Sequence, residues 1–313
     1  MKNFDSLMKL VADQPRCRLA VAAAEDHTVL EAVREAENRG LVEAVLFGDR
    51  REIGRAAERA GYAPGESQVV HEPDAVRAAL GAVSLASAGE AEMVMKGYIH
   101  TDDFLRAVLN RERGLRTGSI MSHVFIAEVR ALDRLLFIAD AAMNIAPDLE
   151  GKAAILLNTV HVATAFGVMR PKVAVLAAVE LVNPAMPATV DAAALAQMSA
   201  RRQFSVPCEV DGPFALDNAI SELAARHKKI TGPVAGWADV LLCPNIETGN
   251  ALAKALAHLG GSRLAGLLVG AKVPVVLTSR ADSAEAKLLS IAAAVFTVNL
   301  ERALWLKVGK VHY

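Results

Sequence analysis

Short apolar runs and helix-like segments alternate along nearly the whole chain, and this alternation limits the possible folds more than any other feature. Buried parallel strands have such runs, and the helices between them return the chain to the start of the next strand. The sequence therefore predicts an α/β fold, with a mostly parallel sheet covered by helices on both faces. We expect strands at residues 18–24, 42–47, 68–71, 92–95, 135–139, 172–179, 210–213, 238–243 and 273–277, helices at 29–39, 53–60, 74–88, 101 onward, 149–166, 189–202, 216–226, 247–259 and 283–295, and a proline-rich loop at 183–187.

The number of domains follows from the length and from a change in character near residue 134. A chain of 313 residues is longer than one typical domain and suggests two. The last strand and helix are expected to return and pack on the first lobe. The predicted first domain is therefore residues 1–133 with 272–313, and the predicted second domain is residues 134–271.

Composition and charge narrow the possible partners. The formal net charge is −1 and no Lys/Arg block stands out, which argues against nucleic-acid binding. The N-terminus has no apolar signal-peptide core, and no run reaches the roughly 18–20 apolar residues of a membrane span. Cys17, Cys208 and Cys243 lie far apart and match no zinc pattern, as expected of reduced thiols in the cytoplasm. We therefore expect a cytoplasmic protein that contacts neither membrane nor nucleic acid.

The stretch 273–287 predicts an anion site. Thr278, Ser279 and Arg280 follow its apolar first half and precede a helix. In open α/β sheets ligands bind beyond the carboxyl ends of strands, where helix N-termini offer unpaired N–H groups to anions. Arginine adds a planar fork for phosphate or carboxylate. The alternative is a capped helix with a solvated arginine, and the spacing alone does not decide between them.

Two carboxylates beside this stretch are interpreted as helix-capping groups. Asp282 stands where an N-cap is expected, and Glu285 follows three residues later, the spacing of a capping box. A second strand ends in polar residues at Lys96–Arg106. There Thr101 is expected to cap a helix, and Arg106 lies about one turn inside it.

Most generic catalytic patterns are missing from the sequence. It contains no Gly-x-Gly-x-x-Gly after a strand, no Walker A loop, no Gly-x-Ser-x-Gly elbow and no His-Glu-x-x-His. The histidines are dispersed. His100 follows a strand end, but solvation or capping explains it as well as catalysis does.

Asn-Pro-x-Met-Pro-Ala-Thr at 183–189 and Thr-Ser-Arg-Ala-Asp-Ser at 278–283, together with six further blocks, nevertheless resemble one family, the phosphate acetyl/butyryl transferases. These two motifs look more like the butyryltransferase branch. The matching blocks occur in the order of the family. They cover residues 96–109, 114–118, 122–123, 139–147, 182–190, 210–220, 244–250 and 278–283.

The resemblance implies a fold and a reaction. The fold would be two α/β/α domains with a cleft between them, similar to the isocitrate and isopropylmalate dehydrogenases. The reaction would be acyl-CoA + phosphate ⇌ acyl phosphate + CoA on a short-chain acyl group such as butyryl, in a homodimer or higher homo-oligomer. Coenzyme A would be a substrate, with no permanently bound cofactor and no metal. Alternatives are acetyl-CoA as substrate or a catalytically silent CoA-binding protein; a decarboxylating dehydrogenase would need clustered Asp residues and a nucleotide loop, which the sequence lacks.

The resemblance also implies roles for individual residues. Arg280 and Arg106 would bind phosphate, and Ser279 would donate to the thioester carbonyl. The family's acetyltransferases carry a catalytic Asp where this chain has Ala286, so a base for the CoA thiol is unassigned. Further predicted substrate contacts are Thr278, Asp282, Asn250, Lys96, His100 and Thr101.

Overall fold

A computed structural model describes residues 1–304 and 310–312, and it is an α/β protein that divides into two compact units. The N-terminal unit comprises Phe4–Ser119 and the chain from Ala265 through the last helix. The central unit is built mainly from Ile120–Leu264. The predicted domain boundaries, at 133/134 and 271/272, stay a prediction about independent domains, and residues 305–309 and 313 of the first lie outside the described residues.

Six strands of the N-terminal unit are neighbours in the order β3-β2-β1-β4-β11-β10. All adjacent pairs are parallel except β10 with β11. Their apolar residues are almost all buried, as expected of strands covered on both faces. The strands are β1 Cys17–Ala22, β2 Val42–Gly48, β3 Val69–His71, β4 Met93–Lys96, β10 Arg263–Val269 and β11 Val275–Val276.

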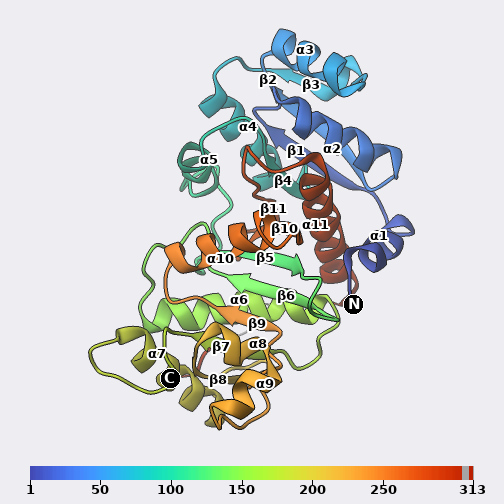
Figure 1. Cartoon of the computed structure of the whole chain (residues 1–313). Coiled ribbons are helices and arrows are strands. Elements are labelled where there is room, and N and C mark those ends of the chain that lie inside the picture. The colour runs from blue at the N-terminus through green and yellow to red at the C-terminus, as the bar shows by residue number, and fades with distance from the viewer. Residues whose placement is uncertain (305–309, 313) are drawn as a thin grey trace. The chain divides into compact units, whose positions relative to one another are not determined.

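Helices cover both faces of this sheet, with α2 and α11 on one side and α4 and α5 on the other (Figure 1). Three of the helices begin at aspartates, Asp26, Asp49 and Asp74, whose carboxylates accept first-turn N–H groups. Alanines on α4 face the sheet and allow close packing. The helices are α1 Phe4–Ala12, α2 His27–Asn38, α3 Arg50–Ala60, η1 Glu66–Gln68, α4 Ala75–Ser87, α5 Thr101–Val108 and α11 Ala284–Leu304.

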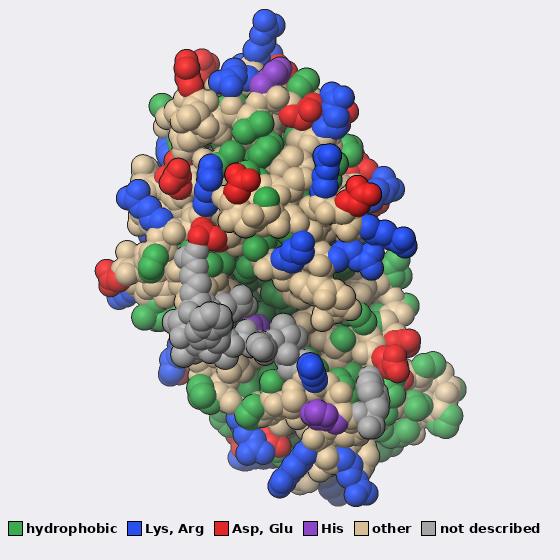
Figure 2. Space-filling view, turned by 180° about the vertical axis from the view of Figure 1, so that it is seen from behind, with side chains coloured by type: hydrophobic (Ala, Val, Ile, Leu, Met, Phe, Trp, Pro, Cys, Tyr) green, Lys and Arg blue, Asp and Glu red, His purple; other side chains and the backbone are tan. Residues whose placement is uncertain are grey.

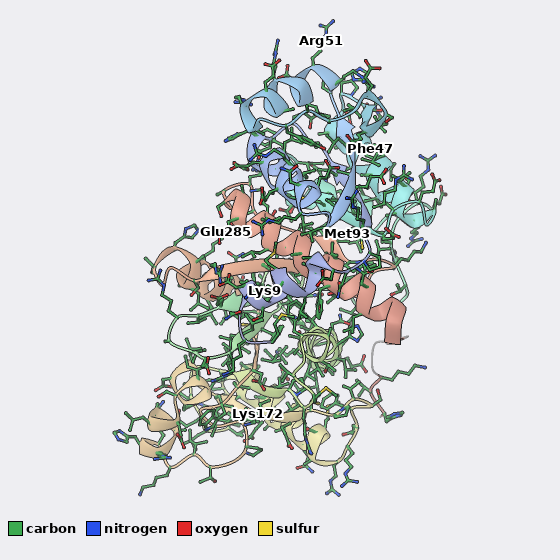
Figure 3. All side chains as sticks on the ribbon, turned by 90° about the vertical axis from the view of Figure 1, so that its right-hand side faces the viewer. Lys9, Phe47, Arg51, Met93, Lys172 and Glu285 are labelled. Carbon is green, nitrogen blue, oxygen red and sulfur yellow. The ribbon has the colours of Figure 1, made fainter. Side chains whose placement is uncertain are left out.

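The side chains of this unit separate as the sequence pattern predicts. Phe47 and Met93 lie inside it, whereas Arg51 points outward from α3 (Figure 3). On its surface, Lys and Arg side chains are interspersed with Asp and Glu, as the upper part of Figure 2 shows. None of the helices in the described part of the chain has the length and hydropathy that a membrane crossing needs.

The chain order reverses at the boundary between β1 and β4. From β1 the chain moves outward to β2 and β3, and it then returns to place β4 on the other side of β1. Ligands of open α/β sheets bind at such switch points, beyond the carboxyl ends of the strands. Here Gly97 N donates to Ala22 O at 2.8 Å and Tyr98 N donates to Ala23 O at 2.6 Å. The end of β4 is therefore pressed against the end of β1.

The central unit has its own strand order, β5-β6-β9-β7-β8, with only β5 and β6 antiparallel. One face is covered by a long buried helix, α6, and the other by α8 and α10. The core on the second face includes Ile138, Leu176, Phe214 and Leu241. The elements are β5 Ser122–Glu128, β6 Leu135–Ala139, α6 Leu149–Ala165, β7 Lys172–Leu176, α7 Pro187–Ala200, β8 Glu209–Phe214, α8 Leu216–Ile220, α9 Glu222–His227, β9 Val240–Leu242 and α10 Ile246–His258.

Several sequence predictions need correction. Strands β5 and β10 were not expected. Pro187 is not loop but the first residue of α7, where a proline loses no hydrogen bond. The helix expected at residues 216–226 is two helices, because Ser221 is extended and caps α9. The cap of α5 is His100 rather than Thr101, which is the first helical residue.

Gly97 gives a direct test of the close approach between β4 and β1. A Cβ at Gly97 would lie 2.1 Å from Ala23 O and 2.5 Å from Ala22 O, both backbone atoms that cannot swing away. We expect Gly97→Ala to lower the free energy of unfolding in urea by about 3 kcal/mol or more.

The matched control is Gly54→Ala, where a Cβ would meet nothing within 4 Å inside helix α3. That change should raise stability by about 0.5–1 kcal/mol, because alanine is the better helix former. Equal effects of the two substitutions would contradict the described packing.

Candidate functional site

The predicted anion stretch forms a tight turn at the end of β11. Asp282 N donates to Ser279 O at 3.2 Å, and Ser279 N donates to Asp282 Oδ2 at 2.7 Å. The Ser279 hydroxyl accepts from Ala281 N at 3.3 Å. Ser279 and Arg280 are thus held on a small, doubly closed loop before helix α11.

The N-cap prediction for Asp282 is wrong. Helix α11 begins at Ala284, and it is the Ser283 hydroxyl that accepts from Ala286 N at 3.2 Å. Asp282 lies one residue too early for a cap, so its carboxylate closes the turn instead. Glu285 is the second helical residue rather than the third, so no capping box is formed.

Arg280 lies beside two side chains from the loop after β4. Its Nη2 is 3.5 Å from His100 Nδ1, and its Cζ is 5.9 Å from the centroid of the Tyr98 ring. The Tyr98 side chain remains 55% exposed. The structure therefore brings two sequence-distant predicted site residues, His100 and Arg280, together at the carboxyl ends of β4 and β11, and it adds Tyr98.

Lys96 is a buried cation at the same place. Only 2% of it is exposed, and its Nζ makes one long contact, 3.5 Å to Gly97 O. Burial, and after it the positive charges of Arg280 and Lys287, lower the pKa of Lys96 from 10.5 to about 8 against the opposing pull of nearby carboxylates. An anion bound beside this group would relieve both effects.

Lys287 is a second buried cation, and sequence analysis missed it. It is 2% exposed, and its ammonium donates to Asp282 O and, at 3.4 Å, to Ser279 O. Burial lowers the pKa of Lys287, and Asp282 and Asp26 oppose that effect. Helical spacing could have found it, because Lys287 lies three and four residues before the buried Ser290 and Ile291.

Thr278 supplies an unsatisfied buried hydroxyl at the end of β11. The residue is 5% exposed, and its Oγ1 has no hydrogen-bond partner among the described residues. Burying a hydroxyl costs free energy because its hydrogen bonds to water are lost, unless a ligand or an ordered water forms a hydrogen bond with it. Thr278 is therefore compatible with its predicted role as a substrate contact.

Arg106 has a different environment. Its side chain is 77% exposed and forms an ion pair with Asp103, with Nη1 to Oδ1 at 2.7 Å. Exposed pairs of this kind contribute little to stability and open easily. Arg106 shares the N-terminal unit with Arg280, but no hydrogen bond joins the two side chains among the described residues, and the phosphate role of Arg106 stays a prediction.

Asn250 belongs to the central unit, where its side chain has a structural contact. The amide Nδ2 donates to Ala141 O at 3.0 Å. The neighbouring Asp140 is buried, and its carboxylate accepts from the N–H groups of His123, Ala142 and Met143. Asn250 thus supports a hydrogen-bonded loop, and its predicted CoA contact remains untested.

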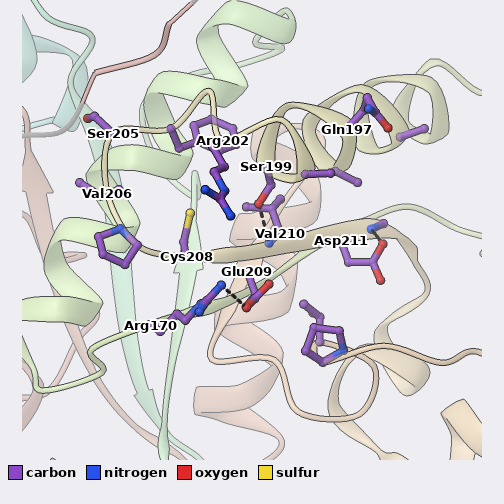
Figure 4. Close-up of a pocket in the computed structure, with 18 residues that line it drawn as sticks. Arg170, Gln197, Ser199, Arg202, Ser205, Val206, Cys208, Glu209, Val210 and Asp211 are labelled. Atoms are coloured by element: carbon purple, nitrogen blue, oxygen red, sulfur yellow. Dashed lines mark hydrogen bonds and ion pairs between the residues drawn. The ribbon is translucent and has the colours of Figure 1, made fainter.

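A hollow of about 930 Å³ also occurs in the central unit, but it contains none of the predicted site residues (Figure 4). Several of its polar side chains are already engaged: Arg170 pairs with Glu209 at 2.7 Å, and Ser199 Oγ accepts from Val210 N at 3.3 Å. Size alone does not make it the reaction site. The buried lysines without a carboxylate ion-pair partner, Lys96 and Lys287, lie in the described part of the N-terminal unit instead.

Comparison with known proteins identifies the family of the chain. The sequence pattern described as phosphate acetyl/butaryl transferase matches residues 66–295, which is most of the chain. The chain belongs to this family. It is therefore an acyltransferase enzyme, as the resemblance implied.

Similar proteins support the assignment over nearly the full length. The chain is 51% identical to phosphate butyryltransferase of Clostridium acetobutylicum over 294 residues, which cover 94% of this chain and 97% of the relative. A branched-chain phosphotransacylase structure from Enterococcus faecalis V583 matches with a TM-score of 0.79 and 35% identity, covering 90% of this chain and 99% of that one.

A more distant likeness concerns the fold alone. The structure of 4-hydroxythreonine-4-phosphate dehydrogenase from Klebsiella pneumoniae matches with a TM-score of 0.52 at 14% identity, over 90% of this chain and 99% of that one. The α/β, dehydrogenase-like fold class expected from the sequence is thereby confirmed.

The unfavourable burial of the Lys96 charge predicts that the protein becomes more stable when this lysine is replaced by an apolar residue. Because its pKa falls from 10.5 to about 8 on folding, the unfolded chain binds more protons between these values, and stability rises with pH through that window. Below the folded pKa the penalty is fully present and amounts to about 3 kcal/mol. Lys96→Met should therefore be more stable than the wild type near neutral pH, and the difference should vanish toward pH 10.5.

Lys152→Met is the matched control for urea unfolding of this variant. Lys152 is also buried, but its Nζ pairs with Asp191 Oδ2 at 2.6 Å. Its loss should lower stability by about 1–3 kcal/mol because a half-buried carboxylate is left unpaired. A Lys96→Met variant less stable than the wild type at neutral pH would refute the desolvated-charge description.

Proposed function

We propose that this enzyme catalyses the reversible reaction acyl-CoA + phosphate ⇌ acyl phosphate + CoA on a short-chain acyl group such as butyryl. One observation carries the proposal beyond family membership. Lys96, Lys287 and Arg280 place positive charge around one turn, and the two lysines are buried without a carboxylate ion-pair partner among the described residues. Such a site gains most from a small, multiply charged anion, and inorganic phosphate is the anion the reaction consumes.

The proposed roles follow from charge and reach. Arg280 binds phosphate or the phosphoryl group of acyl phosphate through its guanidinium fork, and Lys96 adds a point charge from beneath. Thr278 donates its unpartnered hydroxyl to the same anion. The Ser279 hydroxyl donates to the thioester carbonyl, where negative charge develops as phosphate attacks. His100, whose Nδ1 lies 3.5 Å from Arg280 Nη2, also lies beside the bound anion.

The remaining steps need no covalent enzyme intermediate. Phosphate is itself an oxygen nucleophile, and the CoA thiolate is a fair leaving group with a thiol pKa of about 8.5, by analogy with cysteine. Positioning and charge stabilisation can supply most of the rate. A side-chain base for the CoA thiol in the reverse direction is unassigned, because Ala286 stands where the acetyltransferases of the family have Asp.

Two residues predicted to contact substrate, Arg106 and Asn250, already have partners within the protein. Arg106 would have to leave its ion pair with Asp103, at a small cost for an exposed pair. Asn250 donates one N–H to Ala141 O, so it would contact CoA through its Oδ1 or its second N–H, or after that hydrogen bond breaks. The homo-oligomeric state, the cytoplasmic location and coenzyme A as substrate without a permanent cofactor also belong to this proposal.

The experiment that tests the function is a thiol-release assay with phosphate and acetyl-, propionyl-, butyryl- and branched acyl-CoA. We expect the kcat/KM for butyryl-CoA to be higher than the kcat/KM for acetyl-CoA. The reverse ranking would favour a phosphate acetyltransferase. Absence of release from every thioester, with CoA binding retained, would establish the silent binding protein instead.

Arg280 is the residue whose substitution tests the anion site. Arg280→Ala should raise the KM for phosphate and lower kcat, because a charge-assisted bidentate contact of about 1.5–3 kcal/mol is lost. Arg280→Lys should recover only part of this, since an ammonium cannot form the fork. As a control, Arg55→Ala removes an exposed arginine of α3 and should change neither constant. Unchanged phosphate kinetics in both Arg280 variants would remove Arg280 from the site.

A further inference from the structure

Lys287 adds positive charge at the anion turn but contacts no reactant in the proposed reaction, and its placement is unusual. It lies in the first turns of α11, directly after Ala286, and only 2% of it is exposed. Its ammonium donates to two backbone carbonyls, those of Asp282 and Ser279. Both belong to the turn that carries Arg280.

The charge of Lys287 is costly and is not cancelled by an ion pair. Among the described residues no carboxylate lies within ion-pair distance of its Nζ, and its pKa is lowered by burial. The charged groups that face it are Asp282 and Asp26, which favour the ammonium, and Lys96, which does not. A neutral donor could satisfy the same carbonyls at less cost, so a purely structural role leaves the positive charge unexplained.

The two carbonyl contacts fix the direction of the turn. In a trans peptide the carbonyl oxygen and the following N–H point to opposite sides. Because Lys287 takes the oxygens of Ser279 and Asp282, the N–H groups of Arg280 and Ser283 are turned away from it. Neither N–H has a hydrogen-bond partner within residues 1–304 and 310–312. One side of the turn is therefore fastened, and the other presents free donors.

We propose that Lys287 is a positioning residue of the acyl-transfer site. It acts through Ser279 and Arg280 without touching substrate. Its ammonium locks the 279–283 turn in the orientation that aims the Ser279 hydroxyl, the Arg280 guanidinium and the free N–H groups at the reacting anion, and it adds positive charge behind them. This inference rests on the proposed function, because the orientation matters only if this turn binds the reactants.

The central variants are Lys287→Met, which removes the charge and both hydrogen bonds, and Lys287→Arg, which retains them in another shape. We expect Lys287→Met to lower kcat about 10²-fold, the scale of a misplacement of about 1 Å, with a smaller rise in the KM for phosphate. Lys287→Arg should restore part of kcat. The matched control is Lys272→Met, an exposed lysine of the same unit whose Nζ donates to Ser87 Oγ, and its kcat should equal that of the wild type.

Urea unfolding of the same variants separates positioning from support of the fold. Positioning predicts that Lys287→Met is folded under assay conditions and that kcat per folded molecule is still low. Lys287→Gln keeps one neutral donor for the turn but no charge, so it should fold like the wild type with a kcat between those of the wild type and the Met variant. A kcat within about twofold of the wild type in Lys287→Met, or failure of both the Met and Gln variants to fold, would overturn the proposal.

A binding measurement distinguishes failure of this inference from failure of the proposed function. Phosphate binding followed by ³¹P NMR needs no turnover, and Lys287→Met should weaken it a few-fold. If the wild type releases no thiol from any acyl-CoA, the proposed function fails, while the NMR comparison still tests Lys287 as an organiser of the anion site. If the wild type is active and the variants bind phosphate and react alike, only the role of Lys287 is refuted.

Discussion

Buried positive charge without a matching carboxylate is the constraint on which the candidate site depends. Lys96 and Lys287 are each 2% exposed, and their neighbour Arg280 adds a third cation. Removing like charges from water together is unfavourable, and the lowered lysine pKa values express that cost. A bound anion offsets it. The fold thus places excess positive charge at one turn, and a transferase that uses phosphate can neutralise this charge when the anion binds.

Backbone geometry at the strand ends makes this concentration of charge possible. Gly97 lets β4 close on β1, and the same loop then carries Tyr98 and His100 toward Arg280. Lys96, the last residue of β4, is buried at this closure, with its Nζ 3.5 Å from Gly97 O. Lys96, Tyr98 and His100 come from β4 and the loop after it, whereas Arg280 comes from the turn after β11, and the parallel order β1-β4-β11 brings the two segments together.

Family membership and geometry contribute different parts of the functional argument. The similarity to phosphate butyryltransferase identifies the reaction class, which no arrangement of cations could specify. The geometry ranks the residues. It places Arg280, Lys96 and Thr278 in one neighbourhood, leaves Arg106 in an exposed ion pair, and adds Lys287, which the family motifs do not single out.

The sequence by itself determined the α/β class and most elements, because apolar runs and aspartate caps are local signals. It also identified the Thr278–Arg280 stretch, whose residue types fit an anion. Only the tertiary structure decided what the neighbours do. The role of Asp282 changed from helix cap to turn closure because α11 begins after Ser283, one residue beyond what local spacing suggested. The demand for an anion likewise arises only when Lys96 and Lys287, distant in sequence, lose water together, and burial and mutual repulsion are properties of the packed chain alone.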